Sequence, residues 1–210
     1  YMASCDELHI EIQGLGGHGA LPERTINPLF MGAEFVIKAR DYIYKNTPEN
    51  VPSVINFGKF EALGSTNVVP EKAFIKGTFR TMNEEWRAKA KKGLQEVADA
   101  ISKDFKGQIH LNISDGYPFL QNDVQLTRTI RRLTDFNFGE DYVHELPLRM
   151  TAEDFSFYSQ LIPVCFFRLG VSNKEKGIVH GVHNSRFDID NRSLKKGMNL
   201  LSLIGLSELE

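Results

Sequence analysis

The sequence predicts a mixed α/β chain in which a ferredoxin-like domain, with the element order βαββαβ, precedes part of a larger α/β layer. Three observations carry this prediction: four short segments that alternate apolar and polar residues, two longer segments of helical periodicity between them, and a C-terminal part with only one strand pattern. The 210 residues are 41% apolar and 25% charged. This is the composition of a globular protein with a sizeable core.

The elements of the first domain follow from local patterns taken in order. Residues 27–44 have helical spacing, with Pro28 tolerated in the first turn. Asn83 is expected to cap a second helix that Gly107 ends. Alternation predicts strands at 8–13, 54–63, 73–82 and 108–114. Four strands and two helices in this order form the split-βαβ pattern, in which both helices cover one face of the sheet.

The pattern breaks at Gly116-Tyr117-Pro118, and the remainder is not expected to form a domain by itself. Thr151 is expected to cap one of its helices. Helices are predicted over 122–136, over 153–160 and from Ser193 onward, with one buried strand over 164–169. Because a single strand cannot bury itself, residues 118–210 are interpreted as part of a larger layer.

Charge and cysteine usage exclude several classes of protein. A net charge of −2 and a pI near 6.3 argue against nucleic acid or an anionic membrane as the main partner, and no apolar run is long enough to cross a bilayer. Cys5 and Cys165 are too far apart to indicate a metal motif or a disulfide framework. The sequence therefore favours a reducing compartment, and a cytoplasmic location is predicted.

The strongest candidate for chemistry is His18, which lies in Gly16-Gly17-His18-Gly19-Ala20-Leu21-Pro22 directly after the first strand. Small neighbours uncover the imidazole and let the backbone approach a ligand closely. Such a histidine can donate a hydrogen bond or move a proton near neutral pH. The alternative is an ordinary glycine-rich turn whose histidine faces water.

Four further residues are candidates, each with a structural alternative. Arg80 ends a strand and Asn67 lies in the preceding loop, so both are expected at one rim of the sheet, where the guanidinium would bind a carboxylate. Glu153 is expected to line a site or to stabilise a helix start. His183 is a candidate metal ligand, although one loop histidine does not make a metal site. The alternatives are a surface arginine and a solvent-exposed histidine.

Together these motifs resemble the M20 metallopeptidase family, and most closely its amidohydrolase branch of hippurate hydrolases, N-acyl-amino-acid and N-acetyldiaminopimelate deacetylases and auxin-conjugate hydrolases. The resemblance covers essentially the whole chain. It is carried by Gly-Gly-His-Gly-Ala-Leu-Pro, Ser65-Thr66-Asn67-Val68-Val69-Pro70, Gly77-Thr78-Phe79-Arg80-Thr81, Glu153-Asp154-Phe155 and His183-Asn184-Ser185-Arg186-Phe187, in that order. Ser185 and Thr151 depart from the family pattern, which usually has proline and glycine there.

The resemblance implies that a ferredoxin-like lid and dimerisation domain is inserted into a zinc-peptidase-like α/β catalytic domain that binds two metal ions. Residues 1–7 then end the N-terminal catalytic part, 8–116 form the lid, and 117–210 form the C-terminal part of the catalytic domain. The N-terminal part would supply most metal ligands and the glutamate that acts as general base. The chain is accordingly expected to be a fragment that is inactive alone.

The same resemblance implies roles for the candidate residues. His183 would be the last ligand of two divalent ions (Zn, Mn, Ni or Co), and Glu153 would lie beside them. His18 would enter the active site of the partner subunit and stabilise the oxyanion, while Asn67 and Arg80 would contact a small N-acyl amino acid or peptide substrate. A homodimer through the lid is expected. The alternative from another functional class is a non-catalytic ferredoxin-like module that dimerises or binds a small ligand.

Overall fold

The computed structural model describes residues 1–209, which divide into two compact units. The first unit comprises Tyr1–Gln121 together with Leu148–Leu161. The second comprises Asn122–Pro147 together with the residues from Ile162 onward. Among the helices of the described residues, none combines the length and the apolar character that crossing a membrane requires.

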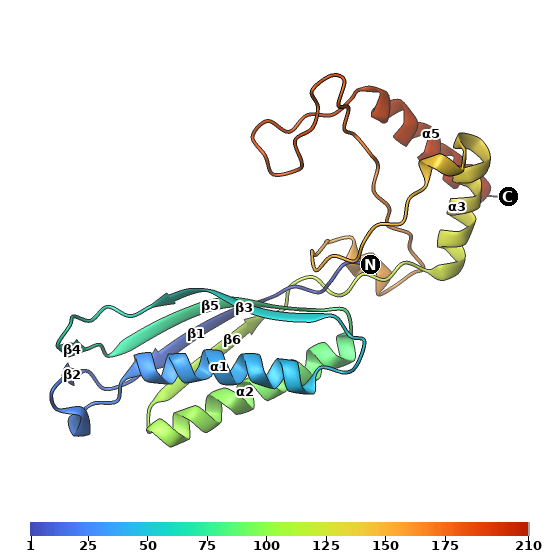
Figure 1. Ribbon diagram of the computed structural model, residues 1–210. Coiled ribbons are helices and arrows are strands. Elements are labelled where there is room, and N and C mark those ends of the chain that lie inside the picture. Colours follow the sequence, from blue (N-terminus) through green and yellow to red (C-terminus); the bar gives the residue numbers. More distant parts are fainter. Residues whose placement is uncertain (210) are drawn as a thin grey trace. The chain divides into compact units, whose positions relative to one another are not determined.

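The first unit contains a four-stranded antiparallel sheet with the strand order β3-β5-β1-β6. Its strands are β1 (Asp6–Gln13), β3 (Ser53–Glu61), β5 (Lys72–Thr81) and β6 (Gln108–Ser114). Helices α1 (Pro28–Asn46) and α2 (Glu84–Phe105) lie side by side on one face of this sheet (Figure 1). This is the ferredoxin-like topology that the alternation of elements predicts.

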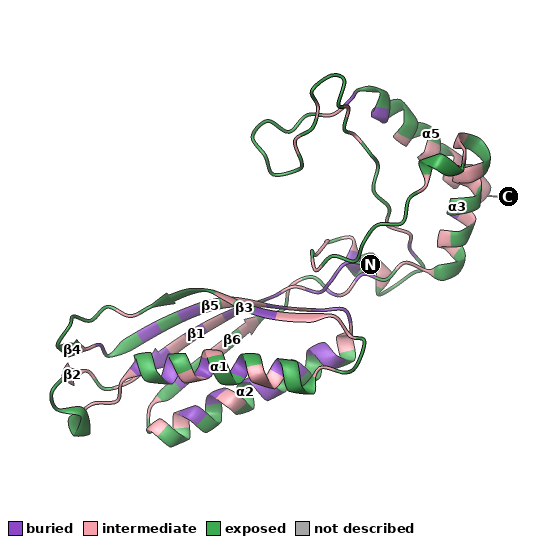
Figure 2. Ribbon diagram, viewed as in Figure 1, coloured by how far each residue is buried: buried purple, intermediate pink, exposed green. Residues whose placement is uncertain are grey.

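The core of the first unit lies between the sheet and the two helices, where the buried faces of both meet (Figure 2). Alternate residues of β1 point inward because side chains of a strand face opposite sides in turn. The largest fully buried side chains of this core come from the sheet (Leu8, Ile12, Ile75, Phe79), from α1 (Met31, Phe35, Ile43) and from α2 (Leu94, Ile101). The other face of the sheet carries polar residues such as Glu7 and His9.

The helix boundaries follow the capping residues in the sequence. The side chain of Asn27 accepts a hydrogen bond from the amide of Leu29, and that of Asn83 accepts one from the amide of Trp86, at 2.9 and 2.7 Å. Helix α2 ends just before Gly107, and Lys106 takes the left-handed conformation (φ 56°) at its C-terminus. Gly107 instead permits close packing, because a Cβ there would lie 2.7 Å from the Sδ atom of Met31.

A buried ionic cluster, formed by Asp6, Arg87 and Lys91, joins the start of β1 to α2. The Asp6 carboxylate accepts hydrogen bonds from Arg87 Nε and Nη2, at 2.8 and 2.6 Å, and from Lys91 Nζ at 2.8 Å. Arg87 also donates to Glu84 and to the carbonyl of Gly116. Asp6 is fully buried, so this Asp6 cluster places a charged group inside the fold and compensates it there.

The short ribbon formed by β2 (Gly17–His18) and β4 (Val68–Val69) was not predicted. Each of its strands has two residues, too few for an alternation pattern to show. A turn of 3₁₀ helix, η1 (Pro22–Arg24), follows β2.

The C-terminal helices agree with the sequence in part. Helix α3 spans Val124–Phe138 and α5 spans Arg192–Ser207, with a 3₁₀ turn, η2, at Glu140–Tyr142. The helix predicted over 153–160 is wrong in extent, since α4 contains only Ser156–Ser159. Thr151 does not cap it: its hydroxyl lies 3.7 Å from Met2 Sδ, and its carbonyl accepts from the amide of Ala3.

The strand predicted over 164–169 does not form. In its place, the Asn122 side chain bonds both to the amide and to the carbonyl of Phe166, each at 2.8 Å, and the amide of Asp123 donates to the carbonyl of Val164. One side chain thus supplies what a neighbouring strand would supply. Large apolar side chains of α5 are exposed, among them Leu194, Met198 and Leu201.

Candidate functional site

His18 lies on a loop at one end of the first unit, here called the tip loop (residues 16–25). A pair of backbone hydrogen bonds between Leu15 and Ile26, 2.9 and 3.0 Å long, closes the base of this loop. The β2–β4 ribbon then pairs His18 with Val68, and the amide of Gly19 donates to the carbonyl of Asn67 at 2.8 Å. The structure therefore brings the backbones of two predicted site residues, His18 and Asn67, together.

The glycines of the tip loop serve this pairing. A Cβ on Gly16 would lie 3.0 Å from the carbonyl oxygen of Val69, and one on Gly19 would lie 3.3 Å from that of Asn67. The close approach that the sequence predicts is therefore made toward the neighbouring chain segment, and it holds the loop in place.

The side chains at the tip are exposed to solvent and partly oriented by local bonds. The Nδ1 atom of His18 accepts a hydrogen bond from the amide of Ala20 at 3.1 Å. The hydroxyl of Ser65 donates to Oδ1 of Asn67 at 3.3 Å. An exposed imidazole on a loop fixed at both sides can meet a ligand without first being ordered.

Arg80 does not share this rim, and the expectation that it lies beside Asn67 is wrong. It pairs with Val54 at the far end of the β3–β5 hairpin, whereas Asn67 precedes the opposite end of β5. At a strand rise of about 3.3 Å per residue, Arg80 lies roughly 25 Å along β5 from Lys72, the end of the strand nearer to Asn67. Residues 62–71 connect β3 to β5 and include Asn67, so Arg80, at the opposite end of this hairpin, is distant from Asn67.

Arg80 instead lies beside the segment that leads to Glu153. Its Nη1 atom donates to the carbonyl of Met150 at 3.1 Å. Glu153 is half-buried, and its carbonyl accepts from the amide of Ser156 at 3.1 Å, at the start of α4. The first unit therefore has two groups of candidate residues: His18 and Asn67 at the tip, and Arg80 with the segment of Glu153 at the other end of β5.

His183 belongs to the second unit and has an unusual backbone conformation. Its φ of 68° lies in the left-handed region, which costs a residue other than glycine about 1–2 kcal/mol. The following turn is held by Asn184, whose side chain accepts from the amide of Arg186 at 2.9 Å and whose carbonyl accepts from that of Phe187. Such conformations cluster at functional sites, which supports a role for His183.

The residues described do not form a metal centre by themselves. Within residues 1–209, no group of three or more histidine, cysteine, aspartate or glutamate side chains is placed to hold an ion. Protein metal sites of the zinc type need three or four such ligands.

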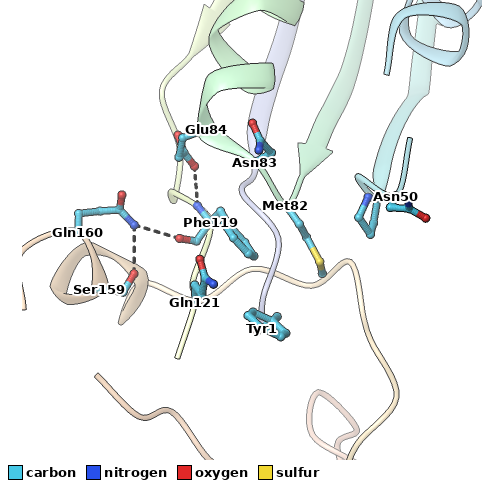
Figure 3. A pocket seen from close by; sticks show the side chains of 10 residues that line it. Tyr1, Asn50, Met82, Asn83, Glu84, Phe119, Gln121, Ser159 and Gln160 are labelled. Atoms are coloured by element: carbon cyan, nitrogen blue, oxygen red, sulfur yellow. Dashed lines mark hydrogen bonds between the residues drawn. The ribbon is translucent and has the colours of Figure 1, made fainter. Parts of the chain in front are cut away.

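The first unit also contains a hollow of about 550 Å³ that no sequence pattern predicts (Figure 3). Gln160 donates to the carbonyl of Phe119 and to the hydroxyl of Ser159, both at 3.0 Å, and Glu84 accepts from the amide of Phe119 at 2.7 Å. These polar groups bond to one another, and the lining includes none of the predicted site residues. The hollow is lined by Tyr1, Asn50, Pro52, Met82, Asn83, Glu84, Phe119, Gln121, Ser159 and Gln160.

Comparison with known proteins relates this chain to one enzyme family. Residues 6–205 match the profile of Peptidase family M20/M25/M40. The IAA-amino acid hydrolase ILR1-like 4 of Arabidopsis thaliana is 30% identical over 195 residues, which is 90% of this chain and 44% of that protein. More generally, the chain spans about half the length of the curated relatives it matches.

Solved structures agree on the fold. A protein from methicillin resistant Staphylococcus aureus superposes with a TM-score of 0.89 at 22% identity, over 100% of this chain and 54% of that one. The YXEP protein of Bacillus subtilis, described as a dinuclear metal binding peptidase, gives a TM-score of 0.72 at 21% identity, over 97% of this chain and 49% of that one. At these identities the likeness concerns the fold alone.

Proposed function

Because the chain belongs to Peptidase family M20/M25/M40, we propose that it is part of a hydrolase that cleaves the amide bond of N-acyl amino acids or similar conjugates. The related Arabidopsis protein is named for the hydrolysis of an amino-acid conjugate, which supports this substrate class. The observation that carries the proposal is the exposed imidazole of His18 on a loop that the backbone holds in place. A fixed donor of this kind stabilises the oxyanion that forms when water attacks an amide.

In this proposed enzyme, each active site combines one group of candidate residues from its own subunit with the other group from the partner subunit. His18 pairs with Val68, which precedes β5, and Arg80 lies roughly 25 Å along β5 from Lys72, so the two side chains cannot both touch one small substrate within a protomer. A tip loop that enters the partner subunit's site removes this conflict. Asn67 then contacts the substrate from the tip, while Arg80 and Glu153 line the site of their own protomer, and the guanidinium binds the substrate carboxylate.

The divalent ions that the family resemblance implies do not fit this chain alone, because the described residues lack a group of three ligands. His183 would contribute a single ligand, and the remaining ligands and the general base would come from the other half of the protein. The exposed apolar face of α5 supports further chain packing against the second unit.

The 210-residue chain is expected to show no amidase activity on N-acyl amino acids, with or without added Mn²⁺ or Zn²⁺. Release of the free amino acid measures this, with the full-length gene product as the positive control. Turnover by the chain alone would contradict the division of the site between two halves of the protein. A Cys-Gly-His-Asp motif and a Glu-Glu pair encoded upstream of Tyr1 would support this division of the site. The absence of both would contradict the proposed hydrolase function.

We also propose that the protein is a homodimer through its lid. Phe30, Ile37 and Tyr44 repeat every seven residues on α1 and are 66, 52 and 60% exposed. Residues at this spacing form one apolar stripe along a helix, the pattern by which helices associate. A second copy of α1 would cover this stripe.

Replacing Ile37 with Lys is expected to raise the dissociation constant of this dimer at least roughly tenfold, because it places a charge in a desolvated contact. Sedimentation equilibrium measures the change. Glu96→Lys, which adds the same side chain to the exposed surface of α2, is the control and is expected to leave the dimer intact. An Ile37→Lys protein that dimerises as the wild type does would place the interface elsewhere.

The alternative, a non-catalytic dimerisation or ligand-binding module, is supported by no specific observation. The Arabidopsis relative named above is a hydrolase.

A further inference from the structure

The imidazole of His18 has one of its two ring nitrogens engaged inside the tip loop. Nδ1 lies 3.1 Å from the backbone nitrogen of Ala20, with the amide hydrogen directed at it. A backbone amide can only donate, so Nδ1 must present its lone pair. In a neutral imidazole the one ring hydrogen then sits on Nε2.

We propose that the backbone amide of Ala20 is a positioning group that holds His18 in the Nε2–H tautomer, so that the tip loop offers a hydrogen-bond donor to an acceptor oxygen. The ligand group that this donor recognises is a carbonyl or carboxylate oxygen. A cation finds no lone pair at Nε2. The consequence for catalysis rests on the proposed function, in which that oxygen belongs to the scissile amide.

The direction of the Ala20 amide is set by the bonds on either side of it. The preceding amide, that of Gly19, donates to the carbonyl of Asn67 at 2.8 Å, and the following one, that of Leu21, donates to the carbonyl of His18 at 2.9 Å. Ala20 thus lies between two residues whose amides make backbone hydrogen bonds, and one of these bonds joins the tip loop to Asn67, directly before β4. The donor is arranged before a ligand arrives, which is the condition for electrostatic stabilisation of a developing charge.

This arrangement restricts what His18 can do in a reaction. With its hydrogen on Nε2 and its lone pair committed to Ala20, the neutral ring has no free site to take a proton from water. It therefore acts as a hydrogen-bond donor to the oxyanion, and general-base catalysis falls to another residue. The sequence is compatible with His18 as a hydrogen-bond donor or as a proton acceptor, and the hydrogen bond from the Ala20 amide favours the donor role.

Nuclear magnetic resonance of the 210-residue chain tests the assignment without any enzymatic activity. With ¹⁵N-labelled backbone and histidine, we expect Nε2 of neutral His18 to carry the hydrogen. We also expect a scalar coupling across the hydrogen bond between the Ala20 amide nitrogen and Nδ1. A ring that is protonated on Nδ1 would overturn the proposal.

A pair of variants separates the amide from the side chain of Ala20. Ala20→Pro removes the hydrogen and is expected to abolish the coupling and let the Nδ1–H tautomer appear, while Ala20→Ser keeps the amide and the wild-type spectrum. The contact between Leu15 and Ile26 shows whether the tip loop remains folded in the Ala20→Pro variant. If that contact is lost, the proposal is tested by the scalar coupling in the wild-type protein alone. A proline variant with an intact loop and an unchanged tautomer contradicts the role of the amide.

The two proposals fail in different ways. If the tautomer is as expected and His18→Ala leaves the turnover of the full-length enzyme unchanged, the catalytic role of His18 is wrong and the tautomer assignment stands. If turnover falls but Nδ1 carries the hydrogen, the positioning role of Ala20 is wrong and the proposed function stands.

Discussion

Replacing Asp6 with Asn is expected to lower the free energy of unfolding of the first unit by about 3 kcal/mol, because it leaves Arg87 and Lys91 charged without their buried partner. Removing one member of a buried pair typically costs about 3–5 kcal/mol. The lower end applies here, since Arg87 keeps Glu84 and the carbonyl of Gly116. Urea denaturation followed by far-ultraviolet circular dichroism measures the change.

The effect of this substitution is expected to depend on pH in a defined direction. Burial raises the pKa of Asp6, but its hydrogen bonds and charge interactions with Arg87 and Lys91 lower it by more, so the net pKa lies below the usual value. A depressed pKa stabilises the fold above the unfolded-state pKa of about 3.9 and ceases to do so as the pH falls through the folded-state value. The difference between wild type and Asp6→Asn should thus be full at neutral pH and shrink below about pH 4.

The matched control is an ion pair on the same helix that is exposed to water. Lys89 and Glu85 lie 2.7 Å apart on α2, with side chains 65 and 78% exposed. Glu85→Gln is expected to leave the free energy of unfolding within measurement error. A loss for Glu85→Gln as large as that for Asp6→Asn would show that burial does not determine the contribution of the Asp6 cluster.

The sequence predicted the first unit well because its elements depend on local patterns. Strand alternation, the cap Asn83 and the helical periodicity of α2 all lie within one element, and each is confirmed. The second unit was predicted less well. Residues 164–169 have the composition of a buried strand, but a strand needs a partner, and here the Asn122 side chain takes that place.

The arrangement of the candidate site could be predicted only in part, for a related reason. The exposed histidine loop was evident from its glycines, whereas its pairing with residues 67–69 joins segments about 50 residues apart and involves strands of two residues. The placement of Arg80 was misjudged because both ends of a hairpin look alike until its register is known. The Asp6 cluster joins residues 81 and 85 positions apart and has no local pattern.

The largest effect on activity is expected from His18. In the proposed full-length enzyme, His18→Ala should lower kcat about 10²–10³-fold with little change in KM, because it removes a donor that acts chiefly on the transition state. His9→Ala is the control, since this histidine lies on the open face of the sheet and bonds to Glu7 at 3.1 Å. A His18→Ala enzyme that retains kcat would contradict the proposed role.

Mixing two inactive variants then tests whether the tip loop acts in the partner subunit. In a heterodimer of a His18→Ala subunit and a His183→Ala subunit, one site combines an intact His183 with an intact His18 from the other protomer, and the second site lacks both. Random association should therefore restore about a quarter of the wild-type turnover, since half of the dimers are mixed and each has one complete site. If His18 served its own protomer, each site of the mixed dimer would lack one histidine and no activity would return. Because the tip loop pairs with residues that precede β5, and Arg80 lies roughly 25 Å along β5 from Lys72, we expect the first result.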